Sequence, residues 1–359
     1  MSNPETTPST SAVSYVLRTL LYRLGADKVT DLAAAMTYYL VLSIFPLLLA
    51  IVSILNLVGG ANWLVPRMEE MVASLVNPQI AAQFADVIGG FLGSAGAGLT
   101  LVVSILASLW SASGYIGAFT RAVNTVYQVN EGRNFFKLKG IQLLMTLALV
   151  MLVILLALAL AVSSPAAYWL GNQVGLGAQF STVWGWLRYP LLGAVVVMLV
   201  QLLYFVAPNV RQPGVRVLSW GSLVAILLTV GIFELFGVYL SVFNGSSNYT
   251  KTYGALAGVI IVLFMAFLTN MALLIGAELD AVLERLHQLK LGLPAESGLL
   301  LPPRDARGIK TSVRTRRKLV AHGHAIQAKA LATGATAPQW YNDAHLDDVR
   351  DEPMETIRS

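Results

Sequence analysis

The sequence predicts an all-α membrane protein with six transmembrane helices, and three observations support this. Of the 359 residues, 56% are hydrophobic and only 12% are charged, whereas a soluble domain carries roughly 25% charged residues. The charges are also unevenly distributed: residues 280–359 carry 22 of them, and the much longer stretch 32–279 carries 15. That stretch contains six apolar runs, each with the roughly 20 residues that a helix needs to cross a bilayer.

We expect the spans at approximately 32–57, 99–120, 141–162, 183–207, 217–243 and 253–279. The third is the clearest, because its 22 residues include no charge. The segment 58–98, between the first two spans, is too polar to cross but contains apolar stretches. It predicts amphipathic helices lying on the outer surface.

The charge distribution divides the chain into three parts. Residues 1–31 form an N-terminal segment in which 12–25 is predicted to be an amphipathic helix at the membrane interface. Residues 32–279 form the membrane domain, and residues 280–359 form a charged tail that we predict to be largely disordered.

The positions of Lys and Arg predict the orientation. The N-terminal segment, the even-numbered connections and the tail together carry 21 of these residues, whereas the connections on the opposite side carry two. Because cytoplasmic loops are enriched in Lys and Arg, we expect both termini in the cytoplasm. An even number of spans agrees with this placement.

Several classes of function are excluded or disfavoured. The chain has no cysteine, so disulfides, thiolate metal sites and cysteine nucleophiles are absent. All four histidines lie in the tail, and no paired acid and base, metal cluster or phosphate-binding GxxxxGK[ST] loop occurs in the spans. We therefore expect no enzyme activity, no cofactor and no metal. The net charge of +5 fits cytoplasmic loops and tails better than nucleic-acid binding.

Five sequence elements resemble one known family. They are TYYLVLSIFPLLL in the first span, RAVNTVYQVNEGR after the second, YFVAPN after the fourth, FELFGVYLSVF in the fifth, and YGALAGVI with LLIGAEL in the sixth. Together they resemble the YihY/virulence factor BrkB family, formerly mislabelled as ribonuclease BN. The likeness covers about residues 15–286 and implies a six-helix bacterial inner-membrane protein. Members are linked to serum resistance and envelope lipid handling, but the family's biochemical function is poorly defined.

Two charges lie within the spans at similar depths. Glu234 is predicted about 6 Å, and Arg188 about 10 Å, from the membrane centre in the outer half. They can approach one another, as an ion pair or as charges lining an outward vestibule. Alternatively, Arg188 reaches the headgroups and Glu234 is a protonated carboxyl bonded to a neighbouring helix.

Asn270 and Glu278 lie on broadly the same side of the sixth span, since eight residues correspond to just over two helical turns. With Glu234 they can form a polar stripe across the membrane. Alternatively, Asn270 makes hydrogen bonds between helices and Glu278 is an ordinary interface residue.

Two further features concern the shape and association of the helices. Pro46 frees the carbonyl of Leu42, which Ser43 is close enough to hydrogen-bond, and it predicts a kink in the first span. Gly254 and Gly258 form a GxxxG element that allows close helix packing and permits a homo-oligomer.

A basic segment in the tail predicts binding to anionic lipid at the cytoplasmic face. Its seven cationic residues are Arg304, Arg307, Lys310, Arg314, Arg316, Arg317 and Lys318. Nucleic acid is the less favoured partner, because no base-stacking aromatic residues accompany the charges.

Two functions remain open. Glu234, Arg188 and Asn270 favour transport or translocation of an envelope lipid or another small molecule. The outer segment and the charged tail favour a membrane scaffold, or envelope-integrity factor, that transports nothing.

Overall fold

The computed structural model describes residues 12–57, 99–161, 177–212, 219–242 and 257–336. Eight helices appear in these ranges: α1 (Ala12–Ala26), α2 (Val29–Leu57), α5 (Leu99–Val126), α6 (Phe135–Ala161), α8 (Gly177–Val206), α9 (Trp220–Val242), α11 (Ala257–Lys290) and α12 (Arg307–Ala332). The extended pairing recorded within them is an isolated antiparallel bridge between Val210 and Pro303. The predicted all-α class is confirmed for the described part of the chain.

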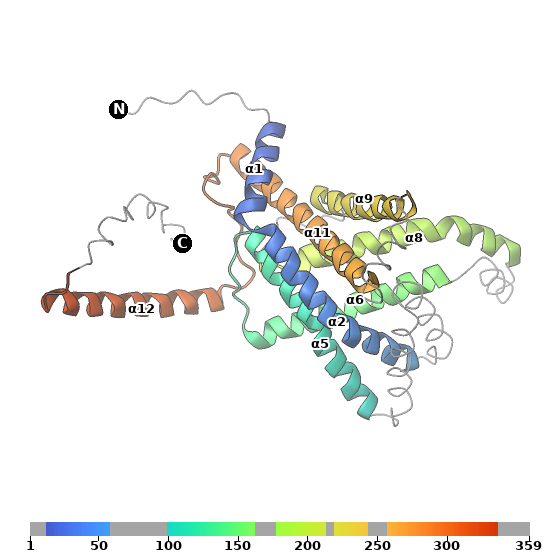
Figure 1. Cartoon of the computed structure of the whole chain (residues 1–359), viewed down its shortest axis with the longest axis horizontal. Coiled ribbons are helices and arrows are strands. Elements are labelled where there is room, and N and C mark those ends of the chain that lie inside the picture. The colour runs from blue at the N-terminus through green and yellow to red at the C-terminus, as the bar shows by residue number, and fades with distance from the viewer. Residues whose placement is uncertain (1–11, 58–98, 162–176, 213–218, 243–256, 337–359) are drawn as a thin grey trace.

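Six of these helices form the bundle (Figure 1). Contacts run in chain order through α2, α5, α6, α8, α9 and α11, and α11 returns to α2, so the helices close a ring. The connections 127–134, 207–212 and 291–306 are hydrogen-bonded to one another at one end of the ring. Because α1 packs against α11 there, we call this the α1 end.

The best-packed core lies near the α1 end. The rings of Phe119 from α5 and Tyr204 from α8 stack with centroids 6.3 Å apart, and Met36 and Leu274 are fully buried in the same cluster. Away from this end the helices spread apart (Figure 1). Large apolar side chains are exposed there, as they are on a surface that faces lipid.

Four helices in the described ranges are long and apolar enough to cross a membrane: Phe135–Leu156, Thr182–Val206, Trp220–Tyr239 and Gly258–Lys290. They overlap the third to sixth predicted spans. Helix α2 contributes a shorter apolar stretch, Val29–Ile44, and α5 covers the predicted second span. A helical membrane architecture is thereby supported, while the number six and the orientation of the termini stay predictions.

Both α2 and α8 contain an internal proline. Helix α2 continues on both sides of Pro46, and α8 contains Pro190, which sequence analysis did not single out. The Ser43 hydroxyl donates to the carbonyl of Tyr39 at 2.7 Å rather than to that of Leu42. The Ser43 hydroxyl therefore does not donate to the carbonyl that Pro46 frees. In a helix a serine hydroxyl reaches back to a carbonyl in the preceding turn, which here is that of Tyr39.

The tail differs from the largely disordered segment predicted from its charge. Helix α11 runs on to Lys290 and ends where Gly292 adopts a φ of 76°, a left-handed conformation that glycine tolerates. Residues 299–306 then pack on the α1 end, and α12 follows. This segment is ordered by backbone hydrogen bonds to the bundle. The distribution of charges along the sequence gives no information about such bonds. The predicted outer helices in 58–98, Gly254 of the GxxxG element, and residues 337–359 lie outside the described residues.

Candidate functional site

The four polar residues predicted within the spans occupy different environments. Asn270 and Glu278 point from α11 into the bundle and are 1% and 0% exposed. Glu234 is exposed on α9, and Arg188 is half-buried on α8. Two of the four therefore belong to the packed interior and two to its outer parts.

Asn270 joins three helices. Tyr115 of α5 donates its hydroxyl to Asn270 Oδ1 at 2.9 Å, and Asn270 Nδ2 donates to Thr37 Oγ1 of α2 at 3.0 Å. Thr37 in turn donates to the carbonyl of Ala33 at 2.8 Å. Interhelical hydrogen bonding of this kind is one of the two roles predicted for Asn270.

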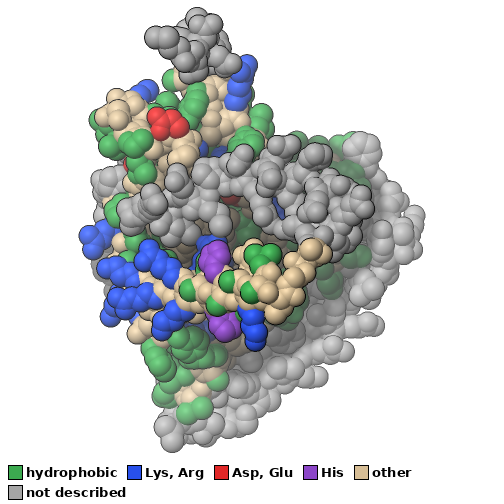
Figure 2. All heavy atoms as spheres, turned by 90° about the vertical axis from the view of Figure 1, so that its left-hand side faces the viewer, with side chains coloured by type: hydrophobic (Ala, Val, Ile, Leu, Met, Phe, Trp, Pro, Cys, Tyr) green, Lys and Arg blue, Asp and Glu red, His purple; other side chains and the backbone are tan. Residues whose placement is uncertain are grey.

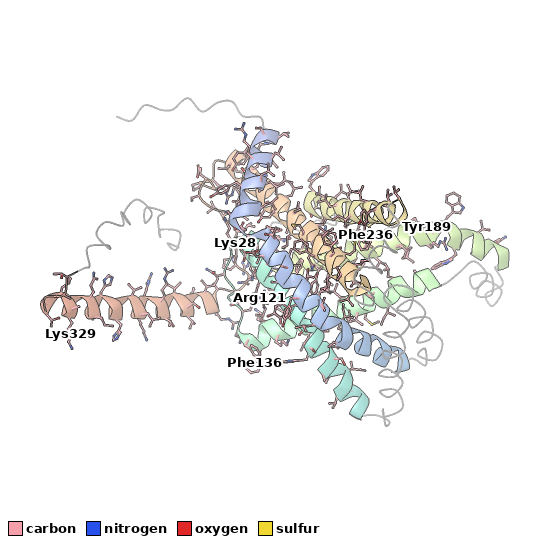
Figure 3. All side chains as sticks on the ribbon, viewed as in Figure 1. Lys28, Arg121, Phe136, Tyr189, Phe236 and Lys329 are labelled. Atoms are coloured by element: carbon pink, nitrogen blue, oxygen red, sulfur yellow. The ribbon has the colours of Figure 1, made fainter. Side chains whose placement is uncertain are left out.

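The structure does not join Arg188 to Glu234. Arg188 donates to the hydroxyl of Tyr189 at 2.6 Å, and its guanidinium lies 4.7 Å from the centre of that ring. Figure 3 labels Tyr189 on α8. The ion pairs recorded for the described residues do not include one between these two residues. The expected ion pair is absent in this structure because the neighbouring tyrosine engages the guanidinium locally.

Glu234 lies in a groove between α8, α9 and α11. The groove has a volume of about 470 Å³. Its lining is mostly apolar and comes from all three helices: Val196, Leu199, Val200, Leu203, Ala225, Ile226, Thr229, Val230, Phe233, Glu234, Thr269 and Leu273. Thr229 donates its hydroxyl to the carbonyl of Ala225 within its own helix. Among the described lining residues, Glu234 is the single ionisable group, and Thr229 and Thr269 are the other polar ones.

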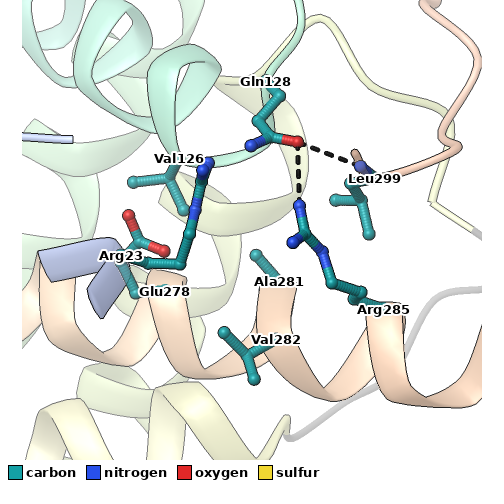
Figure 4. A pocket seen from close by; sticks show the side chains of 8 residues that line it. All are labelled: Arg23, Val126, Gln128, Glu278, Ala281, Val282, Arg285 and Leu299. Atoms are coloured by element: carbon teal, nitrogen blue, oxygen red, sulfur yellow. Dashed lines mark hydrogen bonds between the residues drawn. The ribbon is translucent and has the colours of Figure 1, made fainter. Parts of the chain in front are cut away.

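Glu278 lies beside a second, smaller cavity at the α1 end (Figure 4). This cavity has a volume of only about 10 Å³, and Arg23, Gln128 and Arg285 line it together with Glu278 and apolar side chains. The two cavities share no lining residue. Among the described residues the two cavities are lined separately, so a polar path from Glu234 through Asn270 to Glu278 stays a prediction.

Sequence analysis missed a polar network at the α1 end. Arg133 donates to both carboxylate oxygens of Glu131 at 2.8 and 2.7 Å, and to the carbonyl of Ala207 at 2.8 Å. Asn124 links the same carboxylate, at 3.1 Å, to the backbone N–H of Asn209, at 2.8 Å. The signal was present in the motifs RAVNTVYQVNEGR and YFVAPN, which contain these residues and which the network brings together.

Residues 299–306, which we call the strap, cross this network. Asn209 exchanges hydrogen bonds with the backbone of Asp305 at 2.8 and 3.0 Å. Arg304 donates to the carbonyls of Val210 and Phe205 at 2.7 and 2.5 Å. The Asp305 carboxylate forms ion pairs with Lys137 at 2.9 Å and Arg307 at 2.8 Å. Three connections that are distant in sequence are thus tied together at one end of the bundle.

The strap is expected to loosen in acid. Hydrogen bonds from Arg307 and Lys137 lower the pKa of Asp305. Burial alone would raise the pKa of Glu131, but Arg133 outweighs it and lowers that pKa. A carboxyl group whose pKa is lower in the folded than in the unfolded protein stabilises the fold at any pH above its unfolded pKa of about 4. This stabilisation is lost as the pH falls through the pKa of the folded state. Hydrogen exchange, corrected for its intrinsic pH dependence, should show the amides of 299–306 losing protection below about pH 4.

The variant Asp305→Asn provides the control for this prediction. It should show reduced protection of the strap at neutral pH and a weaker further change in acid. Protection that stays constant from neutral to acidic pH in the wild type would contradict the assigned role of the two carboxylates.

The basic segment is divided between the strap and α12. Arg304 of the strap and Arg307, the first residue of α12, are engaged at the α1 end. The other five cationic residues lie farther along α12, a helix without buried residues: Lys310, Arg314, Arg316, Arg317 and Lys318. Figure 2 shows Lys and Arg side chains gathered on this helix. Lys329, near its end, is far from the bundle (Figure 3). Lipid binding by this segment stays a prediction.

Within the described residues, no group of three or more His, Cys, Asp or Glu residues could hold a metal ion. The chemistry that these residues offer consists of a carboxylate in an apolar groove, a buried carboxyl at the α1 end and a structural polar network.

Comparisons with known proteins agree with this architecture. A protein of Bacillus subtilis (strain 168), YfkH, described by its name as ribonuclease-like, is 27% identical over 277 residues, which are 76% of this chain and 96% of YfkH. A UPF0761 membrane protein of Aeromonas salmonicida (strain A449) is 26% identical over 266 residues, 73% of this chain and 86% of the relative.

A UPF0761 membrane protein of Chlorobium luteolum is 27% identical over 256 residues, 70% of this chain but 56% of that longer relative. No solved structure matches the chain. The family described as Virulence factor BrkB matches residues 20–297, from α1 through all six bundle helices to the loop before the strap. The chain therefore belongs to the virulence factor BrkB family of membrane proteins.

Proposed function

We propose that this protein translocates an amphipathic small molecule, such as an envelope lipid, across the bacterial inner membrane. The groove around Glu234 is the observation that carries the proposal. Its apolar lining from α8, α9 and α11 suits an acyl chain, and its carboxylate suits a cationic or hydrogen-bond-donating headgroup. An ionisable side chain in a membrane span costs a few kcal/mol to insert and commonly marks a substrate or ion path.

The proposal places the α1 end in the cytoplasm. Five cationic residues lie at or near that end, in the terminal turns or connections of the bundle helices: Arg121, Arg133, Lys137, Lys139 and Arg285. Cytoplasmic enrichment in Lys and Arg supports this orientation. Both termini and α12 then lie on the cytoplasmic side. The groove runs from the inner half of the membrane, where Leu203 and Ala225 line it, to Glu234 just past the middle of α9.

Reconstitution into proteoliposomes tests the function directly. We expect the wild type to move fluorescent phosphatidylethanolamine between leaflets, because its ammonium group complements Glu234, and to move phosphatidylglycerol more slowly. The variant Glu234→Gln should lose activity about tenfold, which corresponds to about 1.4 kcal/mol of transition-state stabilisation. Protection of the labelled lipid from an impermeant quencher provides the measurement.

Glu296→Gln is the matched control, since it removes one carboxylate from an exposed position in the loop after α11. It should behave as the wild type does at equal reconstitution. Background rates for the wild type, Glu234→Gln and Glu296→Gln with both lipids would contradict translocation. Such rates would favour the scaffold, whose next test is deletion of α12.

A further inference from the structure

Three of the four buried side-chain polar atoms that lack a hydrogen-bond partner in the described residues lie at one place. They are both carboxyl oxygens of Glu278 and Oδ2 of Asp27, which makes no hydrogen bond but lies 3.0 Å from Nη2 of Arg23; the fourth is Nε of Arg188. Asp27 lies in the turn between α1 and α2, close enough to Glu278 of α11 for the two carboxyl groups to interact. Buried polar atoms without partners are rare in folded proteins, so this cluster requires an explanation.

The cations nearby do not neutralise Glu278. Arg23 forms an ion pair with Asp27 at 3.0 Å. Arg285 directs its guanidinium to Gln128 Oε1 at 3.1 Å, as Figure 4 shows. The ion pairs recorded for the described residues include none to Glu278, which is fully buried. If Glu278 were ionised, its negative charge would lie beside that of Asp27 with no cation to balance it. Burying such an unpaired charge has a high free-energy cost.

We propose that Glu278 and Asp27 together form a proton-binding site. One proton on the Glu278 carboxyl donates a hydrogen bond to the Asp27 carboxylate, so the same proton removes the uncompensated charge and gives the buried Glu278 carboxyl a partner. Binding forms one O–H bond, and release returns the proton to water. Two carboxyl groups in contact commonly share a proton in this way.

The surroundings allow the proton to exchange. The cavity beside Glu278 is polar on the side of Arg23, Gln128 and Arg285, and its free space of about 10 Å³ is close to the smallest that holds one water molecule. The ionisable groups whose charges act on Glu278 are Asp27 and Arg23, at α1, and Arg285 of α11. Tyr127, directly after α5, lies within electrostatic reach of Glu278, Asp280 and Glu284, and Tyr15 acts on Arg285. The cavity does not meet the Glu234 groove, so proton binding can be measured without a transported substrate.

Infrared spectroscopy of the purified full-length protein in lipid nanodiscs tests the site. The wild type at neutral pH should show the carbonyl stretch of one buried, protonated carboxyl, with its shift in D₂O. Glu278→Gln should lose that band, whereas the control Glu296→Gln should keep it. A wild-type spectrum without such a band, or one that Glu278→Gln leaves intact, would overturn the proposal.

Two further measurements cover the case in which Glu278→Gln folds poorly. In Asp27→Asn the like charge is removed, so Glu278 should release its proton at lower pH than in the wild type. A proton kept by the folded state and released on unfolding also makes the wild-type thermal midpoint fall as pH rises from about 5 to 9. Glu278→Gln should flatten this dependence. Because these readouts need no substrate, failure of lipid translocation leaves them interpretable, and an unchanged titration in Asp27→Asn contradicts the pair.

Discussion

Replacing Gly276 of α11 with alanine is expected to destabilise the bundle by about 3 kcal/mol, at the upper end for overpacking of a core. A Cβ atom there would overlap the backbone carbonyl of Gly221 on α9, and it would lie 2.6 Å from the Tyr204 hydroxyl and 2.8 Å from the Ala225 side chain. The closest atom belongs to a helix backbone and cannot rotate away. The change must therefore push α9 from α11, the two helices that form much of the Glu234 groove.

Thermal unfolding in detergent, followed by circular dichroism, provides the measurement. The matched controls are Gly231→Ala and Gly237→Ala on α9, where an added Cβ would meet no atom within 4 Å. These two variants should unfold at or slightly above the wild-type midpoint, because alanine is the better helix former. A midpoint for Gly276→Ala equal to theirs would show that the α9–α11 contact is not as close as described.

Replacing Arg133 with alanine is expected to cost about 3 kcal/mol, the loss typical of removing one partner from a buried ion pair. Its side chain is 2% exposed, against 27% for that of Glu131. The substitution removes both guanidinium hydrogen bonds to the Glu131 carboxylate and the side-chain donor of the Ala207 carbonyl. Asn124 bonds the same carboxylate and also bonds Asn209, which contacts the strap. Once Arg133 no longer holds the carboxylate in place, this connection to the strap is weakened as well.

The readout is the thermal midpoint together with hydrogen exchange of the strap. Arg211→Ala is the matched control, because the Arg211 side chain is exposed and its backbone N–H, which donates to Pro302, is retained. Arg133→Lys should not restore stability, since an ammonium cannot bind both carboxylate oxygens in a planar fork. Full stability in Arg133→Lys would mean that charge alone is required there.

Much of the helical framework could be predicted because it depends on local properties. A span needs only a long apolar run, since a helix satisfies its backbone hydrogen bonds internally. Predictions for Asn270 depended on spacing within one helix, and α11 does direct both Asn270 and Glu278 inward. No ion pair joins Arg188 to Glu234 among the described residues, because similar depths in two helices do not determine how each helix is rotated. Whether the two charges line one vestibule stays a prediction.

The sequence by itself determined the all-α membrane architecture, the approximate helices and the family, because apolar run length and motif order carry that information. Only the tertiary structure decided which polar groups meet: Asp27 with Glu278, Arg133 with Ala207, and Asn209 with Asp305. Helices α6, α8 and α9 are apolar on all sides, so their composition does not define which face packs inward. The neighbours of each polar side chain are set by how the helices pack against one another. The sequence of a single helix does not determine that packing.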